Sequence, residues 1–194
     1  MQAVNHKGHN KPCSFLNMFT GINAIFRTFI RVCLLQSRPQ DLPASSILLT
    51  LSLVIYTAVN VLLALYKITV IKALQASMLE SLLVSAITFI ILMLCRHGER
   101  WLQTLTALAG TGCIMSLLAL PIFYGSTHTS ADAFLRVVIF LLYLGLLLWN
   151  VTVMAHILRH ALDTTFAFGV IFALTYIFIT SMLIDLVIPE LAAI

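Results

Sequence analysis

Apolar residues line one side of a predicted helix near the N-terminus and fill almost every position of five later stretches. Over residues 15–35 the apolar positions recur at helical spacing, and polar residues such as Arg27 and Arg31 fall on the opposite side. This pattern is typical of a helix in the membrane interface, with aromatic rings toward lipid and arginines toward headgroups. We predict such an interfacial amphipathic helix over residues 15–36, with a helix packed on the protein's own spans as the alternative.

Five stretches after it are long and apolar enough to cross a bilayer, which takes about 20 residues of helix. We predict these spans over residues 46–66, 74–95, 101–124, 137–156 and 164–188. Before the first span, Pro39 and Pro43 are expected to end the preceding helix, and Ser45 or Ser46 to cap the next one. Pro121 is expected to kink or end the third span.

Composition agrees with lipid as the main solvent of this chain. Of its 194 residues, 61% are hydrophobic and 9% are charged, with a mean hydropathy of +1.05, whereas a soluble domain carries about 25% charged residues. The predicted fold class is all-α, a polytopic integral membrane protein. Its parts are a flexible N-terminus (1–14), the interfacial helix (15–36) and a five-helix transmembrane domain (37–194). The polar start of the chain argues against a cleavable signal peptide.

The positions of Lys and Arg predict the orientation of the spans. Eight of these residues fall on the side of the N-terminus and three on the other, which favours a cytoplasmic N-terminus and a C-terminus outside. The short polar N-terminus favours a bacterial inner membrane. Because the basic residues are scattered, no nucleic-acid partner is expected, and the single, scattered cysteines suggest neither a disulfide nor redox chemistry.

One stretch offers candidate metal ligands at the end of the fourth span. On a continuing helix, His156, His160 and Asp163 lie at i, i+4 and i+7 and share a face, an arrangement that binds zinc when a further ligand or water completes it. The alternative is a polar helix end where Arg159 and the imidazoles meet lipid headgroups. The spacing lacks the general-base Glu that makes such motifs specific, so no cofactor is predicted.

Four polar residues inside the spans carry a functional hypothesis, because such residues are costly in a bilayer. They are Asn60 in the first span, Glu80 in the second, Asn150 in the fourth and Asp185 in the fifth. The two carboxylates are expected near the outer ends of their helices, where they reach the interface or pair with Lys67 or Lys72. The two asparagines are expected to hydrogen-bond between helices, each bond worth about 0.6 kcal/mol.

Small and hydroxyl residues fill the third span from Thr104 to Cys113, which predicts close helix contacts and a central place in the bundle. The order of features resembles the Yip-type family, the Ypt/Rab-interacting membrane proteins and their prokaryotic relatives. The similar segments are RPQDLPAS, LTALAGTGCIMSLLALPI, LWNVTVMAHILRHALD and FAFGVIFALTY. The resemblance implies a non-enzymatic five-helix protein that binds partners. The chain lacks the long hydrophilic N-terminal domain of eukaryotic members, which points to a prokaryotic-type relative.

Three hypotheses for function follow. The first is a non-catalytic scaffold or accessory subunit that binds lipid, other membrane proteins or further copies of itself. The second is a small transporter or channel that uses the polar residues within the spans. The third is a metal-binding membrane protein centred on the two histidines of the fourth span. The sequence shows no phosphate loop, nucleophile–base pair or other catalytic motif, so we predict that the protein is not an enzyme.

Overall fold

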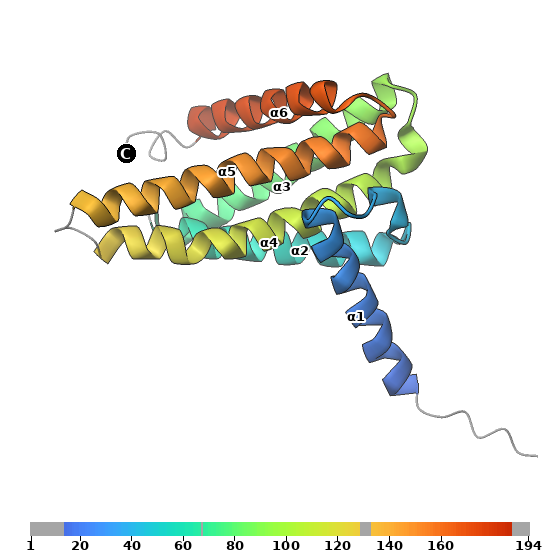
Figure 1. Ribbon diagram of the computed structural model, residues 1–194, viewed down its shortest axis with the longest axis horizontal. Helices are drawn as coiled ribbons and strands as arrows, with labels where there is room; N and C mark the ends of the chain where they lie inside the picture. The colour runs from blue at the N-terminus through green and yellow to red at the C-terminus, as the bar shows by residue number, and fades with distance from the viewer. Residues whose placement is uncertain (1–13, 67, 129–132, 188–194) are drawn as a thin grey trace, which may run out of the picture.

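In the computed structural model of the chain, the structure describes residues 14–66, 68–128 and 133–187, with the side chains of 14–22, 126–128 and 185 left out. The described residues form α-helices and two short 3-10 helices, with no strand among them (Figure 1). The elements are α1 (Ser14–Cys33), η1 (Pro39–Asp41), α2 (Ser46–Ala64), α3 (Val70–Leu94), η2 (Gly98–Arg100), α4 (Trp101–His128), α5 (Ala133–Ala161) and α6 (Phe166–Val187). The predicted flexible segment 1–14 lies almost wholly outside the described residues.

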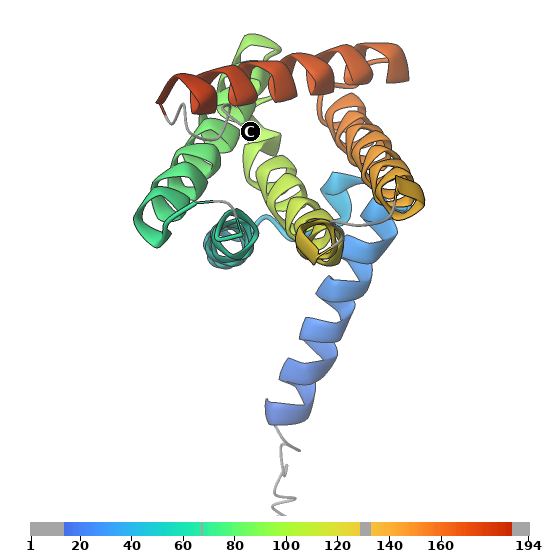
Figure 2. The same ribbon diagram turned by 90° about the vertical axis from the view of Figure 1, so that its left-hand side faces the viewer.

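Helices α2 to α6 are each long and apolar enough to cross a membrane, which confirms the five predicted spans. They form a ring in which consecutive members are in contact: α2 with α4, α4 with α5, α5 with α6, α6 with α3, and α3 with α2. Figure 2 looks along α2, α4 and α5 and shows α6 at the top of the view, where it crosses obliquely from α3 to α5 and closes that side of the ring. The ring leaves space among its members for side chains from five helices.

Helix α4 is the most buried span, as its small residues predict. Half of its apolar stretch is buried inside the protein, against 6–28% for the other four spans. A side chain at Gly110 would collide with the ring of Phe29, and one at Gly112 would lie 2.7 Å from the ring of Tyr56. Small residues on α4 therefore allow α1 and α2 to approach it closely.

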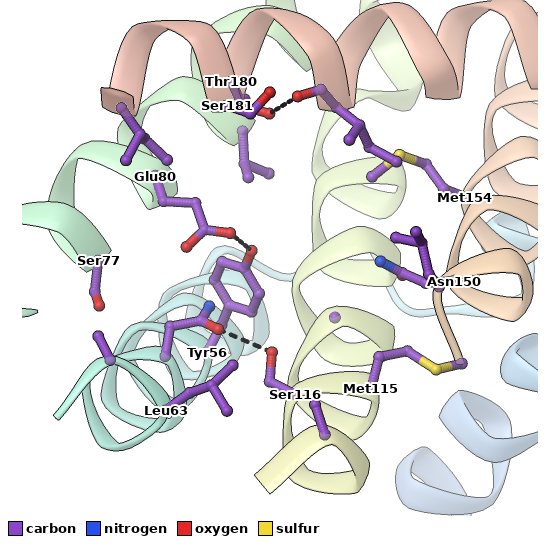
Figure 3. Close-up of a pocket in the computed structure, with 18 of the residues that line it drawn as sticks. Tyr56, Leu63, Ser77, Glu80, Met115, Ser116, Asn150, Met154, Thr180 and Ser181 are labelled. Carbon is purple, nitrogen blue, oxygen red and sulfur yellow. Dashed lines mark hydrogen bonds between the residues drawn. The ribbon is translucent and has the colours of Figure 1, made fainter. Parts of the chain in front are cut away.

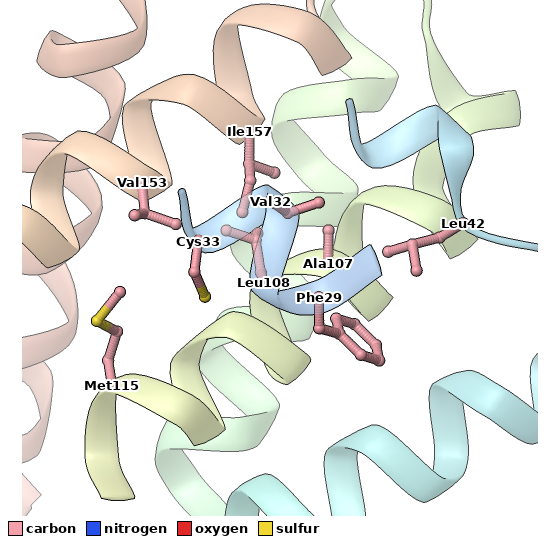
Figure 4. Close-up of a cluster of buried hydrophobic side chains, with 9 residues drawn as sticks. All are labelled: Phe29, Val32, Cys33, Leu42, Ala107, Leu108, Met115, Val153 and Ile157. Carbon is pink, nitrogen blue, oxygen red and sulfur yellow. The ribbon is translucent and has the colours of Figure 1, made fainter. Parts of the chain in front are cut away.

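Helix α1 leaves the bundle at an angle and packs on it only through its C-terminal end (Figure 1). There Phe29, Val32 and Cys33 join a buried cluster with Leu42, which follows η1, and with residues of α4 and α5 (Figure 4). Burial raises the pKa of the Cys33 thiol to about 11, so this cysteine behaves as a small apolar residue. The position of α1 in a membrane interface stays a prediction.

Three helices are followed by a residue other than glycine in a left-handed conformation. Helix α1 ends at Cys33, before the prolines expected to end it, because Leu35 takes a left-handed φ of 62° and the Gln36 N–H bonds to the Arg31 carbonyl at 2.8 Å. The same kind of helix end, usually made by glycine, occurs at Arg96 (φ 60°) and Asp163 (φ 50°). Ser45 caps α2 as predicted, since its Oγ accepts from the Leu48 N–H at 3.4 Å.

Three spans, α3, α4 and α5, are longer than predicted. Pro121 lies inside α4, which continues to His128, so of the two predicted effects of this proline, a kink or a helix end, the second is wrong. A proline is tolerated within a membrane helix because neighbouring groups satisfy the carbonyl that it leaves without a partner. Helix α5 begins at Ala133 and ends at Ala161, which extends the predicted span at both ends.

Candidate intramembrane cavity

A cavity of about 480 Å³ lies inside the ring, lined by residues of all five spans (Figure 3). It occupies the half of the bundle where α2 and α4 end and α3 and α5 begin. We call this region, with residues 111–125 of α4 and 133–152 of α5, the hollow half. The opposite region, with residues 101–110 of α4 and 153–161 of α5, is the packed half. The polar lining residues include Tyr56, Asn60, Ser77, Glu80, Ser116, Asn150 and Tyr176.

Glu80 brings a carboxyl group into this cavity from α3. The Tyr56 hydroxyl of α2 donates a hydrogen bond to Glu80 Oε1 at 2.8 Å, and Glu80 Oε2 makes no hydrogen bond to the described residues. Tyr176 of α6 lies near enough to interact electrostatically with the same carboxyl. Glu80 lies ten residues inside α3, about 15 Å from its start at the rise of an α-helix. It lies deeper than the predicted span implies, because α3 begins at Val70, four residues before the predicted start.

Asn60 links α2 to α4 and leaves one donor without a partner. The Ser116 hydroxyl donates to Asn60 Oδ1 at 2.8 Å, which confirms the expected bond between helices. Asn60 is buried, and its Nδ2 has no hydrogen-bond partner in the described part of the chain. Because an unpaired buried donor costs about 1–3 kcal/mol, this amide is a group that a bound molecule or a water would satisfy.

Asn150 lines the cavity from α5, on the side opposite Glu80 and its tyrosine (Figure 3). Its side chain is half-buried and makes no hydrogen bond within the described residues. The expected bond between helices is therefore not formed at this position. The cavity offers an amide here instead.

An aromatic cluster separates this cavity from a second one. The rings of Tyr66, Phe123 and Tyr143 line both spaces, with centroids 5.3 Å apart for Tyr66 and Phe123 and 5.4 Å apart for Phe123 and Tyr143. The second cavity, about 330 Å³, includes Arg136. No Lys, Arg or His among the described residues lines the larger cavity, so Glu80 is the ionisable carboxyl that defines its polarity.

The structure thus brings together three of the four polar residues that the sequence singles out: Asn60, Glu80 and Asn150. The side chain of Asp185, the fourth, lies outside the described residues. Sequence reasoning missed Tyr56 and its bond to Glu80. One signal was present, since Tyr56 and Asn60 are four residues apart and share a face of their helix.

The predicted metal ligands do not form a common site. His156 Nε2 lies 3.1 Å from the Ser37 carbonyl oxygen, and the rings of His156 and His160 meet edge to face with centroids 4.6 Å apart. Arg159 donates to His160 Nε2 and also stacks over the Phe166 ring. No group of three His, Cys, Asp or Glu side chains able to hold a metal occurs among the described residues.

Asp163 points elsewhere because α5 ends at Ala161, so the continuing helix assumed for the shared face is wrong. Its Oδ2 lies 2.6 Å from Arg100 Nη1 and 3.5 Å from His97 Nε2. The hydrogen bond from the Arg100 guanidinium holds the pKa of the Asp163 carboxyl below its usual value. This pair joins η2 to the turn after α5 and has a structural role in the packed half.

The predicted headgroup contacts differ in their surroundings. Arg27 and Arg31 are exposed on α1, as the interfacial prediction requires, and their contact with lipid stays a prediction. Arg159 is half-buried and engaged by His160 and Phe166.

Comparisons with known proteins add no relative: no family model, curated protein sequence or solved structure matches this chain. The fold and the cavity define an integral membrane protein of five spans with a polar site inside its bundle. Inferences about function therefore rest on that site.

Proposed function

We propose that this protein is a non-enzymatic membrane protein that binds a small solute within its five-helix ring, as a small transporter does. The observation that carries the proposal is convergence: Asn60, Glu80 and Asn150 come from three different helices and line one cavity. A charged or polar side chain within a bilayer costs up to about 2.5–3.5 kcal/mol. Asn60 and Glu80 each make one hydrogen bond between helices, whereas Asn150 makes none within the described residues and still lines the same space.

The cavity also has the size and make-up of a ligand site. Its volume, about 480 Å³, falls within the range of about 300–1,000 Å³ that is common for sites of small molecules. Apolar side chains form most of its wall, with a few polar groups that could orient a ligand. Glu80 Oε2 and Asn60 Nδ2 have no partner in the described residues.

Cysteine accessibility tests this proposal. In a background with the native cysteines replaced by alanine, we expect Ser116→Cys to react with small water-soluble methanethiosulfonates, because Ser116 faces the cavity. Leu118→Cys is the matched control, since it lies on the same helix but outside the cavity and is exposed on the bundle surface. Equal, slow reaction at both positions would contradict the proposal.

A second candidate is the accessory subunit or scaffold that the sequence suggests, including membership of the Yip-type family. Its support is the exposure of α5, of whose apolar stretch 6% is buried, and of α1, which projects from the bundle (Figure 1). Both surfaces would suit lipid or another membrane protein. Extraction in polymer nanodiscs followed by mass spectrometry tests this candidate, which predicts a partner at fixed stoichiometry. Recovery of the chain with lipid alone would contradict it.

The orientation and membrane remain part of the proposal. We propose a cytoplasmic N-terminus, on the basis of the Lys and Arg distribution, and a bacterial inner membrane as the location. The hollow half, where α2 and α4 end, would then face the outer side. Impermeant reagents added to sealed, oriented vesicles would reach Ser116→Cys from that side first.

A further inference from the structure

We infer that the ligand of the cavity is an organic cation, an amine or onium ion with an apolar body, held by the carboxylate of Glu80. This inference rests on the proposed function and adds the chemical class of the solute. It follows from the charge, the unused hydrogen-bonding capacity and the aromatic content of the lining.

The charge of the cavity lining indicates the sign of the charge on the ligand. Glu80 is the carboxyl group in the lining, and no Lys, Arg or His among the described residues lines the same space. Lys72 has an interaction partner of its own, and Arg136 lies in the second cavity beyond the aromatic cluster. A carboxylate in a low-dielectric space without a basic partner attracts a cation strongly and would repel an anion.

Hydrogen bonding leaves the carboxylate available. The Tyr56 hydroxyl occupies Oε1 at 2.8 Å, while Oε2 has no partner among the described residues. Tyr56 is itself held, because its ring packs against Gly112 of α4. The carboxylate is therefore oriented by one fixed donor and presents its second oxygen to the cavity.

Aromatic rings supply the second feature that a cation requires. Tyr56 and Tyr176 flank the carboxyl from α2 and α6, and Tyr143 lines the cavity from α5. Ring faces attract ammonium-type cations, and the attraction is stronger where water is excluded. Met115 and Met154 add flexible, polarisable side chains that adapt to an apolar body of variable shape.

Two ions of closely similar shape and opposite charge provide the test. The full chain in nanodiscs is dialysed against tetraphenylphosphonium or tetraphenylborate, with empty nanodiscs subtracted. We expect saturable binding of the phosphonium and none of the borate. Glu80→Gln should weaken phosphonium binding on the order of 30-fold, the loss of one partner of a buried charge pair. Glu99→Gln, the same change in the exposed loop of η2, should leave binding unchanged.

Further variants keep the test decisive. Glu80→Asp preserves the charge and should retain preference for the phosphonium, even where Glu80→Gln fails to fold. Leu147→Trp fills the cavity, whereas Leu148→Trp adds the same bulk on the exposed side of α5. Leu147→Trp should abolish binding, and Leu148→Trp should not.

The outcomes separate the two proposals. If both ions bind, Leu147→Trp abolishes both and Glu80→Gln alters neither, then the cavity binds solutes but the inference of a cation is wrong. Binding of phosphonium that Leu147→Trp leaves unchanged overturns the inference and the proposed function together. If neither ion binds, the inference is wrong, and the accessibility of Ser116→Cys decides the proposed function.

Discussion

The packed half and the hollow half are built from the same apolar helices but differ in how tightly their side chains pack. In the packed half, Val153, Ala155 and Ile157 of α5 are at most 1% exposed. In the hollow half, α5 has no buried residue from Ala133 to Asn150 among those described. Stability is therefore concentrated at one end of the ring, and the space for a ligand lies at the other.

Polar contacts differ between the halves in the same way. In the packed half, Gln40 donates to the His160 carbonyl at 2.9 Å and Gln103 donates to the Leu42 carbonyl at 3.0 Å, so loop groups are paired across elements. In the hollow half, the amides of Asn60 and Asn150 keep unused hydrogen-bonding capacity within the described residues. This contrast teaches that polar groups here stabilise one region and remain available in the other.

The largest expected effect compares one leucine from each half. Leu105 of α4 is fully buried, so Leu105→Ala should lower the free energy of unfolding by about 2–4 kcal/mol through the cavity that it creates. Leu147→Ala merely enlarges a space that already exists, and should cost less than about 1.5 kcal/mol. Unfolding in mixed micelles measures both. Equal losses would remove the distinction between the halves.

A glycine pair tests the packing of α5 against α6. A side chain at Gly169 would collide with the Ala155 carbonyl oxygen, a backbone atom that cannot rotate away. Gly169→Ala should therefore cost about 1–3 kcal/mol. Gly145→Ala, in the hollow half of α5, meets no atom within 4 Å and should be neutral or stabilising, since alanine favours helix. Thermal unfolding of the two variants compares their stabilities. If Gly169→Ala left the melting temperature unchanged, α5 and α6 would pack less tightly than the structure shows.

A smaller effect is expected at the tyrosine that holds Glu80. Tyr56→Phe removes the hydrogen bond to Oε1 but keeps the ring against Gly112. The loss in unfolding free energy should be about 0.6 kcal/mol. Tyr143→Phe is the control, because its hydroxyl makes no hydrogen bond within the described part of the chain. A loss above about 2 kcal/mol would make Tyr56 a structural element, contrary to its assignment to the cavity.

The smallest effect concerns pH and the packed half. Because Arg100 holds the pKa of Asp163 below its ordinary value, the pair contributes stability above the usual carboxyl pKa. That contribution is lost as the pH falls through the lowered pKa of the folded protein. Asp163→Asn should remove this part of the pH dependence, while Glu99→Gln should retain it. Melting temperatures from pH 7 to acid compare the variants; identical curves for Asp163→Asn and the wild type would contradict this role.

The sequence predicts the five spans because length and apolar content decide membrane insertion. It also predicts the central place of α4, since glycine and alanine permit close approach. It does not predict the left-handed φ at Leu35, Arg96 and Asp163, because residues other than glycine seldom take this conformation. The spacing of His156, His160 and Asp163 assumes that the helix continues to Asp163. Spacing alone does not reveal that the helix ends before Asp163, so it could not exclude a shared face for metal ligands.

The sequence identifies some residues of the candidate site but not their arrangement. Asn60, Glu80 and Asn150 stand out singly, because each is a polar residue in an apolar span. Their meeting in one cavity depends on the order of helices around the ring, which hydropathy does not encode. In the sequence, Tyr56 and Tyr176 are indistinguishable from aromatic residues on an apolar helix face. Only the arrangement of the five helices places them beside the Glu80 carboxyl group.

Hydroxyl-radical footprinting of the unmodified chain in nanodiscs tests the central claim, that the cavity inside the ring admits water and solutes. Met115 and Met154 line the cavity, whereas Met78 and Met182 lie on the outer surface of the spans, 60% and 64% exposed. The account predicts faster oxidation of Met115 and Met154, although they are the more buried pair, because water reaches the cavity and lipid covers the surface. Oxidation of Met78 and Met182 with protection of Met115 and Met154 would contradict it.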